Sequence, residues 1–166
     1  RDLALVDVAL SRERFVATRA IWDMSTIYQV FLTRAEPTAI GLSAVGARLA
    51  QISLTDQGGL YYRLNSPEER EANAGERITD DSSAIVLAPI APGMVPQVDI
   101  AAWGPLIAGE RVAVERRHYT VALDGERAFS VAEGEQLEIV LQRNGPPVVQ
   151  VEAALRQAAT QGLFRM

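Results

Sequence analysis

The residues with the clearest potential for ligand binding lie in segment 36–46, which joins small side chains and glycines to two hydroxyls. Glycine lets a backbone approach a ligand closely and adopt conformations that other residues avoid. Hydroxyls and neighbouring amides can then hydrogen-bond to a polar ligand. We therefore expect Thr38, Gly41 and Ser43 to line a small-molecule site. The alternative role of the two hydroxyls is to cap a turn and a short helix that follows it.

Asp7 is a second candidate, because it interrupts an apolar run over residues 3–10 that is typical of a buried strand. Burying a carboxylate is costly unless the group is paired or hydrogen-bonded. One role for Asp7 is to accept hydrogen bonds from a ligand, and a ribose diol suits it because a carboxylate accepts two donors at once. The alternative is structural: the side chain faces solvent or pairs with an arginine.

A third candidate is the sequence Asp-Gly-Glu-Arg at residues 124–127. Asp-Gly is a strong signal for a tight hairpin turn, and a turn with no further role is one interpretation. In the other, Asp124 contributes to a binding site and Arg127 contacts an anion, with surface ion pairing as the structural alternative for Arg127. His118 lies between two arginines and a tyrosine, which is typical of a solvated residue at the start of a strand.

Several kinds of chemistry lack the residues that they need. The chain has no cysteine, which excludes disulfides and thiol catalysis, and a single histidine, which excludes a two-histidine metal site. We find no serine–histidine–acid constellation and no glycine-rich phosphate loop of the Walker or Rossmann kind. We therefore predict neither catalytic residues nor a metal site in this chain.

Residues 37–46, 88–93 and 124–127 resemble three motifs that follow one another in the same order in the C-terminal part of the ATP-NAD kinase/AcoX-type family. The resemblance extends from Ala4 to Phe164. Residues 37–46 resemble a Thr-Pro-Thr-Gly-Ser-Thr-Ala-Tyr stretch and its Leu-Ser-Ala continuation. Residues 88–93, Ala-Pro-Ile-Ala-Pro-Gly, resemble Thr-Pro-Ile-Cys-Pro-His, and residues 124–127 resemble an Asp-Gly-Gln hairpin. Asp7 stands at the acid of an Asn-acid pair.

The resemblance implies a function that this chain shares with a second domain. In the intact protein the reaction would be ATP + NAD giving ADP + NADP, and an N-terminal α/β domain with a Gly-Gly-Asp-Gly-Thr motif would bind ATP and Mg²⁺. That motif is absent here, so we predict that the chain alone is inactive. The resemblance implies that this chain binds an NAD-like nucleotide. Asp7 would hold a ribose hydroxyl. Thr38, Gly41 and Ser43 would line the site, with Asp124 and Arg127 nearby.

Departures from the family pattern favour a second hypothesis of another class. Val6 replaces the amide of the Asn-acid pair, Ala39-Ile40-Gly41 stand where Gly-Ser-Thr is expected, and Gly93 replaces the histidine. A protein that has lost NAD chemistry could be a structural, oligomerising β-sandwich with a different small-molecule acceptor, and exposed strand edges could pair two chains into a homo-oligomer. A third hypothesis is an acceptor domain for a lipid or another diol.

Composition indicates one globular domain over residues 1–166. The formal net charge is −5, and all sixteen basic residues are arginine, so no basic patch points to a nucleic-acid partner. The apolar run at 84–92 is too short to span a membrane. No charged leader precedes an apolar signal region, and the absence of cysteine fits a cytoplasmic protein.

The patterning predicts a mainly β fold, a β-sandwich with a few short helices. We expect a helix over 24–32 with Asp23 as its cap, an exposed loop over 65–83, and a helix over 152–161 that ends at Gly162. Val151, Ala154, Leu155 and Ala158 should form the buried face of that last helix. Strands are expected over 3–10, 15–20, 49–54, 59–64, 84–88, 97–102, 111–115, 119–123, 128–131, 137–141 and 148–151.

Overall fold

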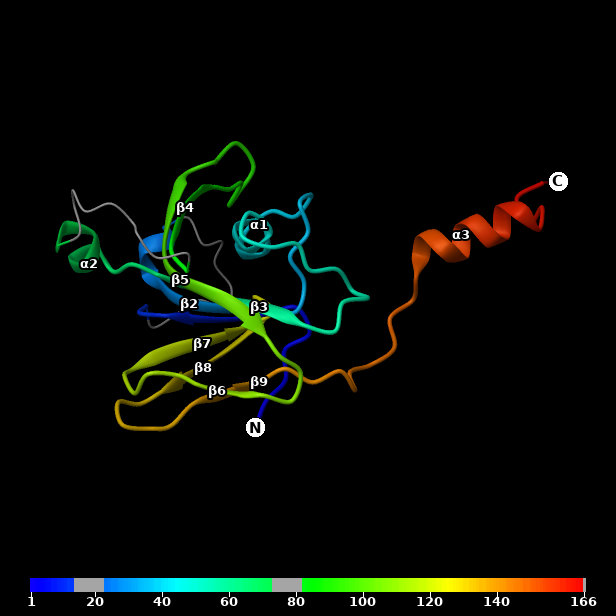
Figure 1. Ribbon diagram of the computed structural model, residues 1–166. Helices are drawn as coiled ribbons and strands as arrows, with labels where there is room; N and C mark the ends of the chain where they lie inside the picture. The colour runs from blue at the N-terminus through cyan, green and yellow to red at the C-terminus, as the bar shows by residue number, and fades with distance from the viewer. Residues whose placement is uncertain (14–22, 73–81, 166) are drawn as a thin grey trace.

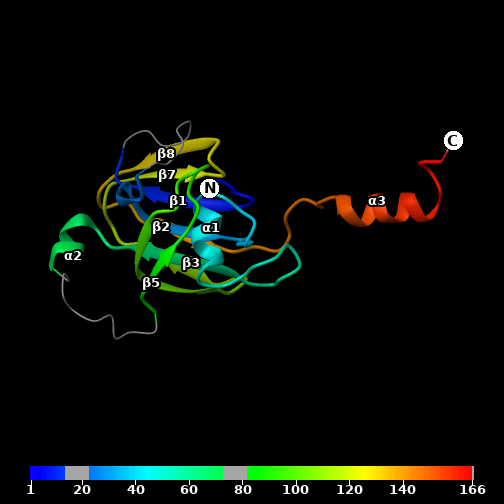
Figure 2. The ribbon, with the colours of Figure 1, turned by 90° about the horizontal axis from the view of Figure 1, so that it is seen from above.

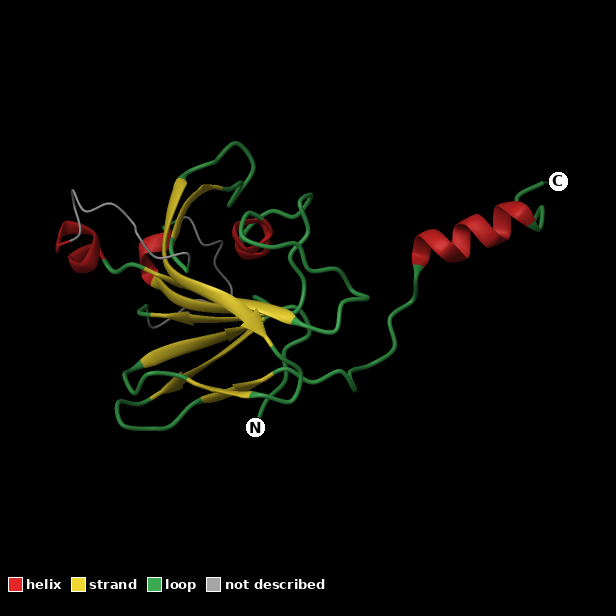
Figure 3. Ribbon diagram, in the orientation of Figure 1, coloured by secondary structure: helices red, strands yellow, loops and turns green. Residues whose placement is uncertain are grey.

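The centre of the molecule is a seven-stranded antiparallel sheet in the order β4-β5-β3-β2-β1-β7-β8 (Figures 1 and 3). The structure is a computed structural model that describes residues 1–13, 23–72 and 82–165. A second sheet pairs β6 with β9. The strands are β1 Asp7–Ser11, β2 Ile27–Leu32, β3 Gly59–Leu64, β4 Ala84–Leu87, β5 Gln97–Leu106, β6 Arg111–Ala113, β7 Tyr119–Leu123, β8 Arg127–Val131 and β9 Glu138–Val140. The helices are α1 Leu42–Ala47, α2 Pro67–Ala72 and α3 Val151–Thr160. The mainly β fold is confirmed.

Both faces of the large sheet are buried at its centre, because a different element covers each one. On one face, Ala9, Val30 and Leu32 pack with Val45 of α1. On the other face, Leu10 packs in a second cluster with Phe31 of β2 and Val121 of β7. Val114 and Leu141, which directly follow β6 and β9, belong to the same cluster. Alternate side chains of β1 therefore enter opposite cores, which explains why β1 and β2 read as nearly continuous apolar runs.

The predicted helix over 24–32 is wrong. Only a single 3-10 turn, Met24–Thr26, forms there, and Asp23 caps it as expected by accepting the Ser25 N–H at 2.8 Å. The remaining residues form β2, which pairs antiparallel with β1 on one side and β3 on the other. Because β2 is buried on both faces, it carries apolar residues at spacings that also fit one face of a helix. Pairing with β1 and β3 decides in favour of the strand.

Other predicted boundaries also need correction. Residues 49–54 make only an isolated bridge, Ala35 to Ile52, and 148–151 form no strand because the chain there is exposed until α3 begins. The first strand begins at Asp7 rather than at residue 3. Helix α2 occupies part of the predicted loop, and the predicted strand over 15–20 lies outside the described residues. The strands over 59–64 and 119–123 are confirmed with their bounds, and those near 84–88, 97–102, 111–115, 128–131 and 137–141 with shifted ends.

Helix α3 stands apart from the two sheets at the end of an extended segment (Figures 1 and 2). It begins and ends one residue earlier than the predicted 152–161, and its stop before Gly162 agrees with the sequence. Gly162 has the positive φ of 72° that a helix-ending glycine commonly adopts. The predicted buried face is wrong, since no residue of α3 is buried. None of the described helices is long and apolar enough to cross a membrane.

Candidate functional site

Three of the residues singled out from the sequence, Asp7, Thr38 and Ser43, line one open pocket of about 460 Å³. Arg34 and Glu36 line the same pocket. Pockets of a few hundred Å³ with a small number of convergent polar groups are typical small-molecule sites. The pocket is therefore the candidate functional site of the described chain.

The pairing of β1 with β2 brings these residues together. Asp7 lies opposite Leu32, the last residue of β2, so the segment that follows β2 begins beside Asp7. Gly41 turns this segment into α1 with a φ of +87°, a conformation that glycine adopts without a steric penalty. The Gly41 N–H donates to the carbonyl of Pro89 at 2.9 Å, which ties the pocket segment to the 88–93 segment.

Asp7 presents a carboxylate that no described residue stabilises by a hydrogen bond. It lies on the face of β1 that also carries Ala9 and packs against α1. Burial, together with the negative charge of Asp124, raises the pKa of Asp7 to about 6. The carboxyl also raises the pKa of the buried Tyr62, after the larger effect of burial. At neutral pH Asp7 is a largely ionised acceptor whose hydrogen-bonding capacity is unused within the described part of the chain.

Sequence reasoning missed the ion pair beside Asp7. Arg34 Nη2 lies 2.8 Å from Glu36 Oε2, and this bond holds the pKa of Glu36 below its usual range. The carbonyl of Arg34 accepts a hydrogen bond from Ser43 Oγ at 3.2 Å. Opposite charges two residues apart at the start of the small-residue segment were the available signal. The pair lines the pocket while its two charges largely neutralise each other.

The two hydroxyls differ in what they do. Ser43 Oγ donates to the carbonyl of Arg34 and does not cap α1, whose N-cap, Gly41, has no side-chain hydrogen bond, so the capping role considered for it is wrong. Thr38 is exposed, and no hydrogen bond of its hydroxyl occurs among the described residues. Thr38 is therefore the hydroxyl that remains available to a ligand.

Asp124 and Arg127 contact the N-terminal segment and do not line the pocket. Asp124 Oδ1 accepts the N–H groups of Val6 at 2.7 Å and of Asp7 at 3.1 Å, and both carboxylate oxygens accept that of Leu5. Arg127 donates through Nη1 to Asp2 at 2.6 Å and through Nη2 to the carbonyl of Leu3. Both residues hold the backbone that leads into β1, so they position Asp7 without contributing side chains to the pocket lining.

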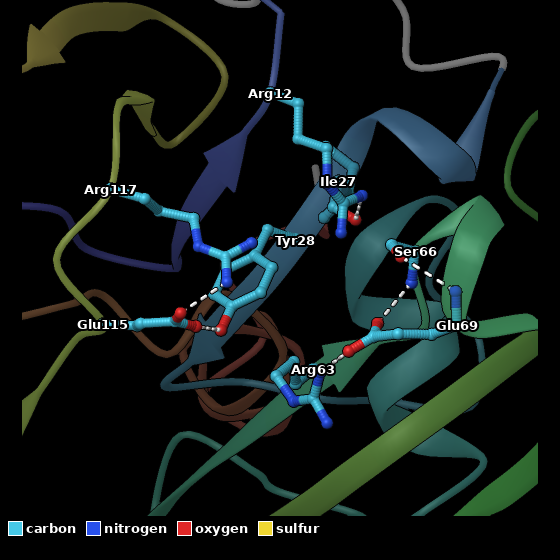
Figure 4. A network of polar contacts seen from close by, with 8 residues as sticks. All are labelled: Arg12, Ile27, Tyr28, Arg63, Ser66, Glu69, Glu115 and Arg117. Atoms are coloured by element: carbon cyan, nitrogen blue, oxygen red, sulfur yellow. Dashed lines mark hydrogen bonds and ion pairs between the residues drawn. The ribbon is translucent and has the colours of Figure 1, made fainter. Parts of the chain in front are cut away.

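A second polar cluster lies at the other end of β2 (Figure 4). Tyr28 Oη donates to Glu115 Oε2 at 2.6 Å, and the Arg117 guanidinium lies over the Tyr28 ring at 4.6 Å from its centroid. Arg12 also faces this ring, at 5.5 Å. Bonds from Arg117 and Tyr28 hold the pKa of Glu115 below its usual range. Glu115 accepts from both Tyr28 and Arg117, whereas the buried Nη2 of Arg12 has no hydrogen-bond partner among the described residues. The cluster joins β2 to the segment between β6 and β7.

The described residues contain no group of three or more His, Cys, Asp or Glu side chains that could hold a metal ion. Asp7 and Glu36 are the carboxylates of the pocket, and Glu36 is engaged by Arg34. Asp7 is therefore the pocket carboxylate that remains available to accept a hydrogen bond.

Comparison with known proteins identifies the family of this chain. Residues 1–144 match the family described as acetoin catabolism protein X C-terminal domain. The acetoin catabolism protein X of Cupriavidus necator is 34% identical over 165 residues, which cover 99% of this chain and 43% of that protein. The chain thus spans less than half the length of this relative, and no match was found among solved structures. The chain belongs to the acetoin catabolism protein X family, of which residues 1–144 form the C-terminal domain.

Proposed function

We propose that this domain binds the hydroxyl-bearing acceptor of an AcoX-type phosphotransferase, with an NAD-like nucleotide as the acceptor and its ribose diol at Asp7. The observation that carries the proposal is the partly buried Asp7 carboxylate, which faces the pocket and accepts no hydrogen bond from the described residues. A buried acceptor without a donor is costly, and a diol would supply two donors to it.

The charges of the pocket favour an acceptor over a triphosphate. Asp7 and Glu36 are acids, and the guanidinium of Arg34 is already bonded to Glu36. A triphosphate would meet an uncompensated carboxylate, whereas an uncharged diol would be attracted by it. ATP and Mg²⁺ would therefore be held by a partner domain, as the resemblance to ATP-NAD kinases implies.

Each pocket residue has a defined part in this proposal. Asp7 accepts hydrogen bonds from the diol and fixes its orientation, and Thr38 offers a hydroxyl at the pocket wall. Ser43 holds the backbone carbonyl of Arg34, and Asp124 holds the backbone from which Asp7 projects. Orienting a hydroxyl for transfer lowers the barrier of a phosphoryl transfer mainly by positioning.

The test is a calorimetric titration of the chain with NAD, NADP and ATP in turn. We expect saturable binding of NAD or NADP, no saturable binding of ATP, and at least about tenfold weaker nucleotide binding by Asp7→Asn, because an amide offers one acceptor where the carboxylate offers two. Glu110→Gln is the matched control, since Glu110 is exposed and away from the pocket. Equal nucleotide affinity of Asp7→Asn and the parent chain would refute the proposal.

A further inference from the structure

Helix α3 displays an apolar face that nothing in the described chain covers. Val151 and Leu155 are 62% and 54% exposed, and Ala154 and Ala158 lie at helical spacing from them on the same side. The side-chain bonds of the helix stay within it: Arg156 Nη2 to Glu152 at 2.7 Å, and Thr160 to the carbonyl of Arg156. The helix is thus amphipathic, and none of its apolar residues is buried against another described element.

The end of α3 is specified by the sequence. The Leu163 N–H donates to the carbonyl of Ala158 and the Gly162 N–H to that of Ala159, which together form a Schellman motif around the left-handed Gly162. Leu163 and Phe164 follow and are 69% and 65% exposed. A ten-residue helix is only marginally stable in water on its own. A capped helix with an exposed apolar face and an exposed apolar end is typical of a segment that packs on a partner surface.

The segment before α3 holds the helix away from the two sheets. Arg143 donates to the carbonyls of Gln57 and Gly58 and so fixes the point where the chain leaves the domain. Residues 142–150 are all exposed and include the consecutive prolines 146 and 147, which favour a stiff, extended spacer. Figures 1 and 2 show α3 standing clear of the sheets in two perpendicular views.

We infer that the apolar face of α3 docks onto an apolar groove of another domain of the same AcoX-type polypeptide. The family match ends at residue 144, within the spacer and before α3, while the match to the Cupriavidus protein includes nearly the whole chain and therefore the helix. More than half of that relative lies outside the matched region, so it has enough chain for a further domain. The inference shares with the proposed function only the premise of a second domain.

Hydrogen exchange measured on an intact AcoX-type polypeptide that includes this chain tests the inference. We expect the hydrogen-bonded amides of α3 to exchange at least 100-fold more slowly there than in the 166-residue chain alone. Leu155→Glu should remove most of this protection, because it places a charge on the docked face. Gln157→Glu is the matched control: it adds the same charge on the opposite side of the helix and should leave the protection intact.

Three outcomes would overturn the inference. The first is equal exchange of α3 in the intact polypeptide and in the chain alone. The second is equal loss of protection in the two variants. The third is protection of α3 in the chain alone that grows with protein concentration, which would identify a second copy as the partner. Each result is independent of whether NAD binds at Asp7, so failure of the docking and failure of the proposed function can be told apart.

Discussion

Asp7 is held in surroundings that oppose its charge. The carboxylate of Asp124 accepts the N–H of Asp7, which fixes its backbone, and the same carboxylate lies close enough to repel the side chain. Burial adds the larger effect, and together they raise the pKa of Asp7 to about 6. Functional sites often contain such a group, which lines a pocket and lowers the free energy of unfolding when it is ionised. At the scale of the residue, the candidate site is thus a position where stability and ligand binding conflict.

Replacing Asp7 with asparagine should therefore stabilise the domain at neutral pH. The folded pKa of Asp7 lies above its unfolded value, so its contribution to stability is full below about pH 4 and is lost as the pH rises through 6. At about 1.4 kcal/mol for each pH unit between the two pKa values, the loss at pH 7 reaches up to about 3 kcal/mol. We expect Asp7→Asn to gain about 1–3 kcal/mol at pH 7 and close to nothing at pH 4.

Urea unfolding of both proteins at the two pH values measures this difference. Glu110→Gln serves as the control, because it removes an exposed carboxylate without touching the pocket. A stability gain of Asp7→Asn that is the same at pH 4 and pH 7 would show that the change acts through packing and not through the charge of Asp7.

At the scale of elements, the sequence predicted the bounds of β3 and β7 correctly but failed at β1 and β2, which lie between them in the sheet. The strand over 119–123 is confirmed with its bounds, because an apolar run between turn residues has few alternatives. Strand β2 was predicted as a helix, since its apolar residues face two cores and their spacing is also compatible with a helix. Which pattern wins depends on pairing with β1 and β3, and such distant contacts cannot be inferred from local spacing.

The candidate site was predictable in part. Asp7 and Thr38 stand out in the sequence by their residue types, and the structure brings them to one pocket although about thirty residues separate them. The role of Asp124 in holding β1 was not predictable, because Asp-Gly reads as an ordinary hairpin turn. Its three backbone partners lie more than a hundred residues away in the chain. Only the antiparallel pairing of β1 with β7 places this turn beside the start of β1.

Gly59 tests how closely these elements must approach one another. A Cβ added at this first residue of β3 would lie 2.5 Å from the carbonyl oxygen of Leu32, a backbone atom that cannot rotate away. Leu32 in turn pairs with Asp7. We expect Gly59→Ala to cost about 2–3 kcal/mol, as overpacking typically does, and to weaken nucleotide binding by shifting the strand that supports Asp7.

Chemical denaturation and the nucleotide titration provide the two readouts for Gly59→Ala. Gly145→Ala is the matched control: a Cβ there meets nothing within 4 Å, so its stability change should stay within about 0.5 kcal/mol. Similar values for the two variants would mean that β2 and β3 can separate without cost.

At the scale of the whole molecule, the chain divides into a packed domain and a helix that the domain does not need. The last buried side chain is Leu141, which belongs to the core between the two sheets, and no described residue after it is buried. The hydrophobic stabilisation of the fold therefore ends where the family domain ends, at about residue 144. The spacer and α3 add exposed apolar surface without adding to this core.

A chain that ends at Asn144 should consequently fold as well as the complete chain. We expect its thermal midpoint to lie within about 2 °C of the parent value, because the removed residues bury nothing on the domain. Its nucleotide affinity should also be unchanged, since the pocket lies between β1 and α1. Light scattering should give the same association state for both chains at equal molar concentration, because the inferred partner of α3 is another domain and not a second copy.

A chain that ends at Leu137 is the control for this truncation. It loses β9 and Leu141 and thereby exposes the core that β6 and β9 cover, so its midpoint should fall by many degrees. Scanning calorimetry and light scattering on the three chains give both quantities. A large drop for the chain ending at Asn144 would mean that α3 does pack on its own domain in solution.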